Sequence, residues 1–179
     1  MLLAFVPFLL FAVLDQRIGI SPSLIAAALA SLAIVLRDQL ILKKPPKILE
    51  VGSLLLFGAL GGATIFTAFA PSVIQVRLLV DIGLLAIVAG SIAVGKPFTL
   101  QYARERVSPE IASTMRFRKT ATRIALAWAA AFAVIVAADA AMSYLPSVTT
   151  SLGTAVIIAA LAAAFWFTSW LPKVSAGKL

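Results

Sequence analysis

Residues 73–94 read VIQVRLLVDIGLLAIVAGSIAV, a nearly continuous apolar run. An α-helix rises about 1.5 Å per residue, and a helix of about 20 apolar residues crosses the hydrocarbon of a bilayer. The run is therefore long enough to be a transmembrane helix. Its two ionisable residues, Arg77 and Asp81, are four positions apart and lie near its beginning. The stretch predicts a membrane protein with two charged side chains in or beside the lipid.

The composition of the whole chain agrees with this prediction. The sequence has 179 residues, of which 62% are hydrophobic and 12% are charged, and its mean hydropathy is +1.07. So few charged side chains could not cover a water-soluble domain of this length. The net charge is +8, but the charges cluster between apolar runs as in membrane proteins, so no nucleic-acid partner is expected.

Four further apolar runs are long enough to cross a membrane: residues 18–36, 51–70, 124–144 and 152–171. Residues 2–14 form a shorter run of about 20 Å, which predicts a half-span or an embedded helix bent near Pro7. Turns are expected at Pro71 and Ser72 and around Pro146. The sequence thus predicts an all-α polytopic membrane helix bundle in a single integral membrane domain, residues 1–179. The bundle has five transmembrane helices, or six if residues 2–14 also cross.

The positions of the basic residues predict the orientation, because cytoplasmic loops retain Lys and Arg. Three regions that alternate correctly along the chain hold all 15 basic residues except Arg17 and Arg77. They contain Arg37, Lys43, Lys44 and Lys47; then Lys96, Arg104, Arg106, Arg116, Arg118, Lys119 and Arg123; and finally Lys173 and Lys178. We therefore expect a cytoplasmic C-terminus. Trp128, Trp166 and Trp170 lie near the predicted cytoplasmic ends and are expected to anchor helices at that interface.

Residues 96–120 are predicted to be a basic cytoplasmic loop with an amphipathic helix. Leu100, Ala103 and Val107 have helical spacing, which is typical of a helix lying on the inner leaflet. Ser108 is then expected to cap a new helix, with Pro109 at its first position, that runs toward the last two spans. The candidate contacts with the membrane surface or with a partner protein are Lys96, Arg104, Arg106, Arg116 and Arg118. A basic loop that only obeys the positive-inside rule explains most of the same evidence.

The candidate polar site consists of Arg77, Asp81 and Asp139. Counting along the predicted helices puts both carboxylates at a similar depth in the outer half of the membrane, with Asp15 and Arg17 nearby. A charge at the centre of a membrane helix costs roughly 2.5 to 3.5 kcal/mol, so a partner or a water-filled pocket is expected. These residues form either a structural ion pair that fixes helix packing, which we favour, or a small outward-facing site for a proton or an ion. The remaining carboxylates lie in or beside basic loops, where salt bridging or solvation is expected: Asp38, Glu50, Glu105 and Glu110.

The sequence contains no Cys and no His. Thiolate chemistry, disulfides and the usual zinc and haem ligands are therefore absent, and no catalytic residue, metal or cofactor is predicted. No phosphate-binding loop or nucleophile elbow is present. Gly58 and Gly62 lie four residues apart in an apolar run, a spacing that lets a neighbouring helix approach closely. They are the candidate helix-packing residues.

Several short motifs are distributed over most of the chain: FVPFLLFAVLD at residues 5–15, FGALGGATIF at 57–66, IQVRLLVD at 74–81, GKP at 95–97 and ALAWAAAF at 125–132. In this order they resemble the bacterial intracellular septation protein A family. Lys96-Pro97 and Leu126-Ala127-Trp128 match places where that family has a Lys-Pro step and a Leu-Ala-Trp start. GKPFTLQYARE, residues 95–105, also resembles bacterial membrane proteins of unknown role. The resemblance implies five spans, no catalytic activity, and a part in envelope integrity or septation through contacts with division and wall-synthesis proteins.

The leading hypothesis is a non-enzymatic protein of the bacterial inner membrane with a structural or interaction role in envelope maintenance or septation. Its expected partners are the bilayer, anionic lipid headgroups at the cytoplasmic face, and other membrane proteins of the envelope or division machinery. One alternative is a small solute or ion transporter or channel that uses Asp81, Asp139 and Arg77. A second alternative is an accessory subunit of a larger membrane complex, without a cofactor of its own.

Overall fold

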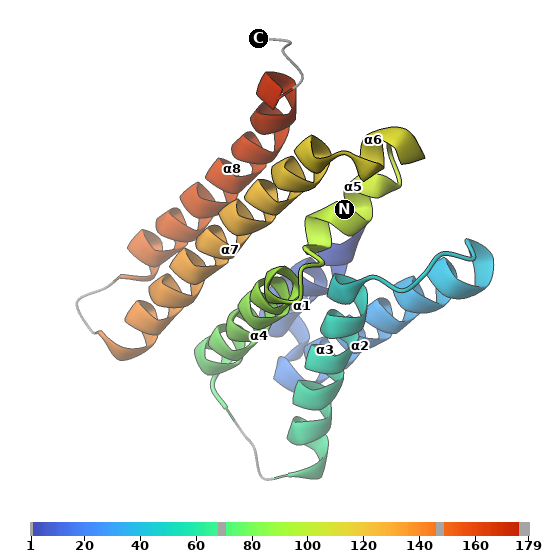
Figure 1. Ribbon diagram of the computed structural model, residues 1–179. Helices are drawn as coiled ribbons and strands as arrows, with labels where there is room; N and C mark the ends of the chain where they lie inside the picture. The colour runs from blue at the N-terminus through green and yellow to red at the C-terminus, as the bar shows by residue number, and fades with distance from the viewer. Residues whose placement is uncertain (1, 68–70, 146–148, 176–179) are drawn as a thin grey trace. The chain divides into compact units, whose positions relative to one another are not determined.

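The fold is helical throughout the part of the chain that the structure describes. A computed structural model describes residues 2–67, 71–145 and 149–175, and Figure 1 shows them as helices joined by short connections. These residues contain no β-strand. The predicted all-α fold class is therefore confirmed.

Five helices of the described chain are long and apolar enough to cross a membrane, as the hydropathy predicts. They are α2 (Ile20–Leu36) with its π-helical extension η2 (Arg37–Ile41), α3 (Ile48–Phe66), α4 (Val73–Ala93), α7 (Met115–Tyr144) and α8 (Thr150–Ser175). Each apolar run has the length that bilayer thickness demands, which is why hydropathy finds these helices. The turn predicted around Pro146 lies outside the described residues.

The chain divides into two compact units, Met1–Leu84 and Leu85–Leu179. In unit 1, a short 3₁₀ helix, η1 (Leu2–Phe5), leads into α1 (Val6–Ile18); α1 packs against α2, and α2 packs against α3. The core of this unit combines Phe11, Leu24, Phe57 and Val76, which come from α1, α2, α3 and α4. The sequence predicts that both units belong to a single membrane domain, and this stays a prediction.

Two backbone positions define α1. Pro7 lies in the first turn of α1, where it costs no helical hydrogen bond, and the 3₁₀ helix η1 ends just before α1. The bend near Pro7 stays a prediction. Gly19 ends the helix with φ +88°, a conformation that glycine adopts without a Cβ clash. The backbone N–H of Ser23 (3.3 Å) and its hydroxyl (2.5 Å) both donate to the Gly19 carbonyl oxygen, which fixes the start of α2.

The close approach of α3 to α2 is made by Gly61. A Cβ at this position would lie 3.6 Å from the Leu24 Cβ and 3.8 Å from the Ile25 backbone nitrogen. A Cβ at Gly58 would have nothing within 4 Å, and one at Gly62 would meet only Phe66 of its own helix. Within unit 1, α2 therefore meets the Gly61 face of α3 rather than the face of Gly58 and Gly62. That Gly58 and Gly62 admit another neighbouring helix stays a prediction.

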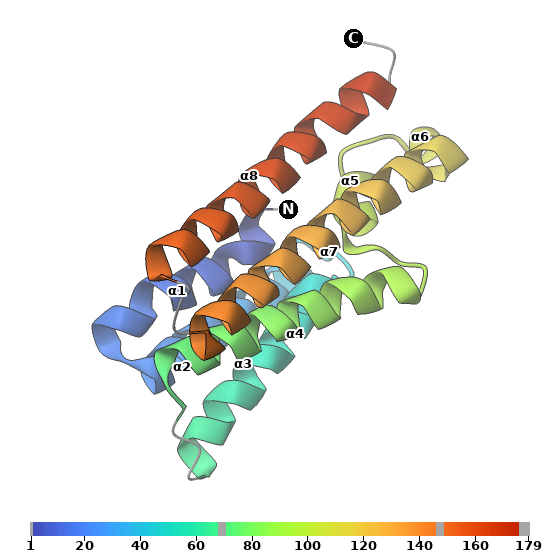
Figure 2. The same cartoon turned by 90° about the vertical axis from the view of Figure 1, so that its left-hand side faces the viewer.

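In unit 2, α7 and α8 form an antiparallel hairpin, which can be followed in Figure 2. Trp128 of α7 is 1% exposed, and its indole N–H donates a hydrogen bond to the Thr168 hydroxyl of α8 at 2.9 Å. Its ring also contacts Phe165 of α8 edge-on, with centroids 5.0 Å apart. The expectation that Trp128 anchors the helix at the membrane interface is wrong, because its ring lies inside the hairpin.

We call residues 96–120, the predicted basic loop, the basic segment. The helix predicted in it is present as α5 (Phe98–Arg104), but the apolar side of this helix is covered by protein. Phe98, Leu100 and Tyr102 are buried, and the Thr99 hydroxyl donates to the Ala121 carbonyl of α7 at 2.6 Å. The helix ends before Val107, so the predicted stripe through Val107 is wrong. The predicted contact of this apolar face with lipid is replaced by a contact with protein, because α5 packs against α7.

A second short helix, α6 (Pro109–Ser113), begins where the sequence predicts, with Pro109 in its first turn. Ser108 occupies the N-cap position, but the predicted side-chain cap is wrong, because its side chain makes no capping hydrogen bond. It does not continue into the membrane, which corrects the expectation of one helix running toward the last spans. Thr114 interrupts it in an extended conformation and caps α7, since its hydroxyl accepts a hydrogen bond from the Phe117 N–H at 3.2 Å. The long helix therefore starts at Met115.

Candidate functional site

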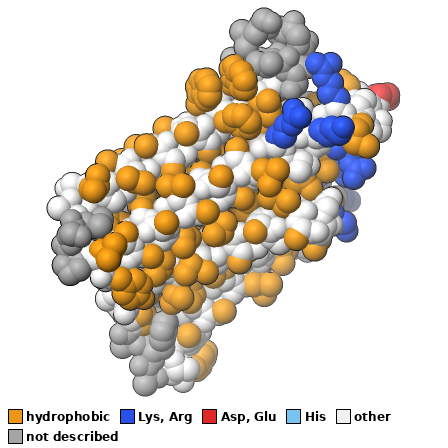
Figure 3. All heavy atoms as spheres, turned by 60° about the vertical axis from the view of Figure 1, so that its left-hand side comes forward, with side chains coloured by type: hydrophobic (Ala, Val, Ile, Leu, Met, Phe, Trp, Pro, Cys, Tyr) orange, Lys and Arg blue, Asp and Glu red, His pale blue; other side chains and the backbone are white. Residues whose placement is uncertain are grey.

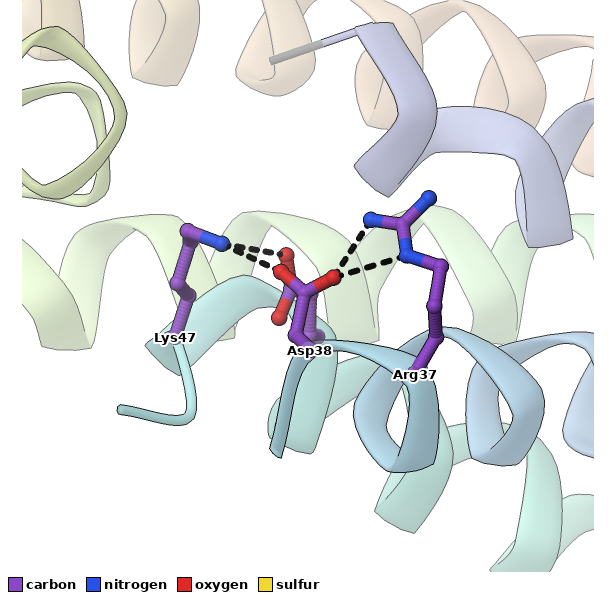
Figure 4. Close-up of polar contacts among 4 residues, drawn as sticks. Arg37, Asp38 and Lys47 are labelled. Atoms are coloured by element: carbon purple, nitrogen blue, oxygen red, sulfur yellow. Dashed lines mark hydrogen bonds and ion pairs between the residues drawn. The ribbon is translucent and has the colours of Figure 1, made fainter. Parts of the chain in front are cut away.

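A cluster of four charged side chains joins the end of α2 to the start of α3. It consists of Arg37 and Asp38 in η2, Lys47 at the N-cap of α3, and Glu50 in the first turn of α3. Figure 4 shows Arg37 and Lys47 pointing at Asp38 from opposite sides. We call these residues the hairpin charge cluster.

The local sequence explains why Asp38 points inward at this place. Pro45 and Pro46 cannot continue a helix, so the chain must turn between α2 and α3. Before the turn the helix widens into π geometry, and the Leu42 N–H donates to the Arg37 carbonyl at 3.1 Å. The Lys44 N–H then donates to the Asp38 carbonyl at 2.8 Å, which ties the turn back to the helix.

The hairpin charge cluster is nearly neutral overall and deeply buried around Asp38. The Asp38 side chain is 2% exposed; its Oδ1 accepts a hydrogen bond from Arg37 Nε at 2.9 Å and also contacts Arg37 Nη2. Its Oδ2 accepts one from Lys47 Nζ at 2.6 Å, and Lys47 Nζ also lies 3.2 Å from Glu50 Oε1. Lys47 therefore bridges two carboxylates from two helices, which suits a structural clamp on the α2–α3 hairpin.

Salt bridging, one of the two roles expected for Asp38 and Glu50, is confirmed, and solvation is wrong because both are buried. Lys47 was missed as a site residue. The opposite charges of Lys47 and Glu50, three residues apart just after Pro45 and Pro46, were an available signal for this contact. Its pairing with an Asp nine residues earlier depends on the turn and was not readable from spacing.

A second buried ion pair joins α1 to α4 in unit 1. Arg77 Nε lies 2.6 Å from Asp15 Oδ2, and Arg77 Nη2 lies 3.0 Å from Asp15 Oδ1, so the contact is bidentate. Asp15 is buried and Arg77 is partly exposed. The expected proximity of these two residues is confirmed. The pairing of Arg77 with Asp81 along α4 stays a prediction.

Arg77→Lys should lower the free energy of unfolding of the protein by about 1 to 2 kcal/mol. An ammonium keeps the charge but cannot make two parallel hydrogen bonds to the Asp15 carboxylate. Detergent-induced unfolding in mixed micelles, followed by circular dichroism, measures the change. Arg17→Lys is the matched control, because Arg17 is exposed on α1, and it should change the midpoint little. Equal effects from both variants would contradict the bidentate role.

Asp139 lies on α7 in unit 2 and is 5% exposed. Its main-chain carbonyl accepts a hydrogen bond from the Ser143 hydroxyl at 2.7 Å. Its carboxylate makes no ion pair within the described residues. Asp81 and Asp139 belong to different units, so their common depth in the membrane stays a prediction.

The predicted basic contacts are all exposed and lie in or beside α5, α6 and α7: Lys96, Arg104, Arg106, Arg116 and Arg118. Nearby, a hydrogen bond from Ser108 and one from the Glu110 backbone hold the pKa of the Glu110 carboxyl below its ordinary value. Glu110 therefore stays ionised beside these cations at neutral pH. The basic segment is a surface of mixed charge with a positive excess.

The five long apolar helices define a multi-pass membrane protein. No protein-family model, curated protein or solved structure matches the chain. Within the described residues, no group of three or more acidic side chains is arranged to hold a metal ion. The functional proposal therefore depends on the geometry of the charged residues.

Proposed function

We propose that this chain is a non-catalytic protein of the bacterial inner membrane with a structural or interaction role in envelope maintenance or septation. The likeness of its short motifs to the septation protein A family supports the proposal. The alternation of basic and apolar segments supports a cytoplasmic C-terminus. In this proposal the exposed basic segment contacts other membrane proteins of the envelope or division machinery.

The observation that carries the proposal is that buried charges in unit 1 are paired with one another across helices. Asp15 bonds to Arg77, and Asp38 bonds to Lys47, at 2.6 Å in each case. Ion pairs of this kind hold one helix to another, as a scaffold requires.

The interaction role can be tested by purifying the tagged protein from its native membrane in mild detergent and quantifying the proteins that accompany it. Arg104→Gln/Arg106→Gln should lower the recovery of envelope or division proteins by about fivefold or more, because exposed charges steer and hold protein partners. Lys43→Gln/Lys44→Gln removes the same charge from another loop and is the matched control. Equal recovery from the wild type and both variants would contradict partner docking through this segment.

A buried carboxylate favours a second candidate function, which is transport of a proton or a small cation. Asp139 is buried in a membrane-spanning helix and has no ion pair within the described residues. Ionisable groups inside a membrane commonly mark ion pathways. Proton or cation flux into proteoliposomes tests this function. A flux that is present in the wild type and abolished in a folded Asp139→Asn variant would establish transport and overturn the structural proposal.

A further inference from the structure

The first turns of α7 border an open surface pocket of about 400 Å³, which we call the cavity. Its lining residues are Met115, Arg116, Lys119, Thr120 and Arg123, all of which belong to unit 2. The cavity thus lies where the basic segment ends and the apolar helix begins. Figure 3 shows Lys and Arg side chains gathered together beside hydrophobic side chains on the face that it draws.

Helical geometry puts the three cations of the cavity on one side of α7. Arg116, Lys119 and Arg123 follow one another at spacings of three and four residues, so their side chains project in similar directions. All three are exposed, and none makes an ion pair within the described residues. The cavity therefore presents three positive charges that form no salt bridge within the described residues.

The chemistry of the lining suits a phosphate group. Two guanidinium groups and an ammonium supply charge-assisted hydrogen bonds, and guanidinium matches the geometry of phosphate oxygens. The Thr120 hydroxyl is a further polar group on the same side of the helix. The cations also lie near the N-terminal end of α7, where the helix dipole favours an anion, although its effect fades beyond the first turn.

The apolar surroundings distinguish a lipid from a free phosphate ion. Met115 lines the cavity and is 64% exposed, and Ile111 of the adjacent α6 is 52% exposed. Beyond Arg123, α7 becomes the apolar helix that is long enough to cross a membrane. A phospholipid has both parts that this arrangement would accommodate, a phosphate for the cations and acyl chains for the apolar surface. We propose that the cavity binds the phosphate of an anionic phospholipid headgroup.

Native mass spectrometry of the full chain in detergent, titrated with phosphatidylglycerol, tests the proposal. Arg116→Gln/Lys119→Gln/Arg123→Gln should weaken phosphatidylglycerol binding about 100-fold, since each cation near an anionic lipid contributes roughly fivefold. Arg17→Gln/Lys43→Gln/Lys44→Gln removes three charges outside the cavity and outside the predicted membrane-surface contacts, and should weaken binding less than about fivefold. Zwitterionic phosphatidylcholine should bind all three proteins weakly and alike.

Three results would overturn the proposal. Equal losses from the two triple variants would mean that general surface charge, rather than the cavity, attracts the lipid. Unchanged binding in the cavity variant would exclude the site. Displacement of phosphatidylglycerol by millimolar inorganic phosphate would assign the cavity to free phosphate.

A pair of single variants keeps the test decisive if the cavity triple variant does not fold. Lys119→Gln should weaken phosphatidylglycerol binding roughly fivefold and Lys43→Gln less than about twofold, because Lys119 lines the cavity and Lys43 does not. Equal effects from these two variants would contradict the site.

Discussion

Lys47→Met should lower the free energy of unfolding by about 3 to 5 kcal/mol, whereas Arg37→Met should lower it by less than about 1 kcal/mol. Both side chains bond to Asp38, but Lys47 also bonds to Glu50. Burial separates them further: the Lys47 side chain is 7% exposed and the Arg37 side chain is 41% exposed. Without Lys47, two buried carboxylates lose the ammonium that they share. Without Arg37, Asp38 keeps its bond to Lys47.

The same experiment can separate a loss of charge compensation from a loss of packing. Unfolding by a denaturing detergent in mixed micelles gives the free energies, provided that the transitions are two-state. Adding Asp38→Leu and Glu50→Leu to Lys47→Met should recover most of the lost stability, because well-packed apolar groups can replace a buried ion cluster. The electrostatic explanation fails if Lys47→Met costs no more than Arg37→Met. It also fails if the triple variant is no more stable than Lys47→Met.

The number and approximate position of the membrane helices were predictable from sequence, because the bilayer imposes a length on every apolar run. Helix starts were also readable where local chemistry specifies them, as at Pro109. The interruption at Thr114 was missed, although a capping hydroxyl before a long helix is a recognisable signal. These features are local, and each is specified by a few neighbouring residues.

The candidate sites were less predictable because they depend on how helices are rotated and paired. Asp15 and Arg77 are far apart in sequence, and only a shared depth suggested that they meet. Gly61 rather than Gly58 faces α2, a difference of a few residues that hydropathy cannot resolve in a helix that is apolar all round. The hairpin charge cluster required the π turn and the Pro45-Pro46 turn together. Side-chain pairing across a turn is a property of the folded hairpin.

Trp128→Ala should lower the free energy of unfolding by about 3 to 5 kcal/mol, the usual cost of removing a buried aromatic side chain. The ring is 1% exposed and contacts Phe132 of its own helix and Phe165 of α8, with centroids 5.5 and 5.0 Å away. The indole N–H also bonds to the Thr168 hydroxyl at 2.9 Å. Truncation therefore leaves a cavity inside the α7–α8 hairpin and removes a hydrogen bond between its helices. Trp128→Phe keeps much of the ring volume and should cost about 1 to 2 kcal/mol.

Trp166→Ala is the matched control for this prediction. Trp166 lies on α8, is 63% exposed and stacks on Trp170 with centroids 5.5 Å apart. Its removal should cost less than about 1 kcal/mol in detergent, because a lipid or detergent chain can replace the exposed ring. A similar loss from Trp128→Ala and Trp166→Ala would favour interfacial anchoring for both rings. A loss confined to Trp128, with Trp128→Phe in between, would show that this ring stabilises the hairpin through interhelical packing.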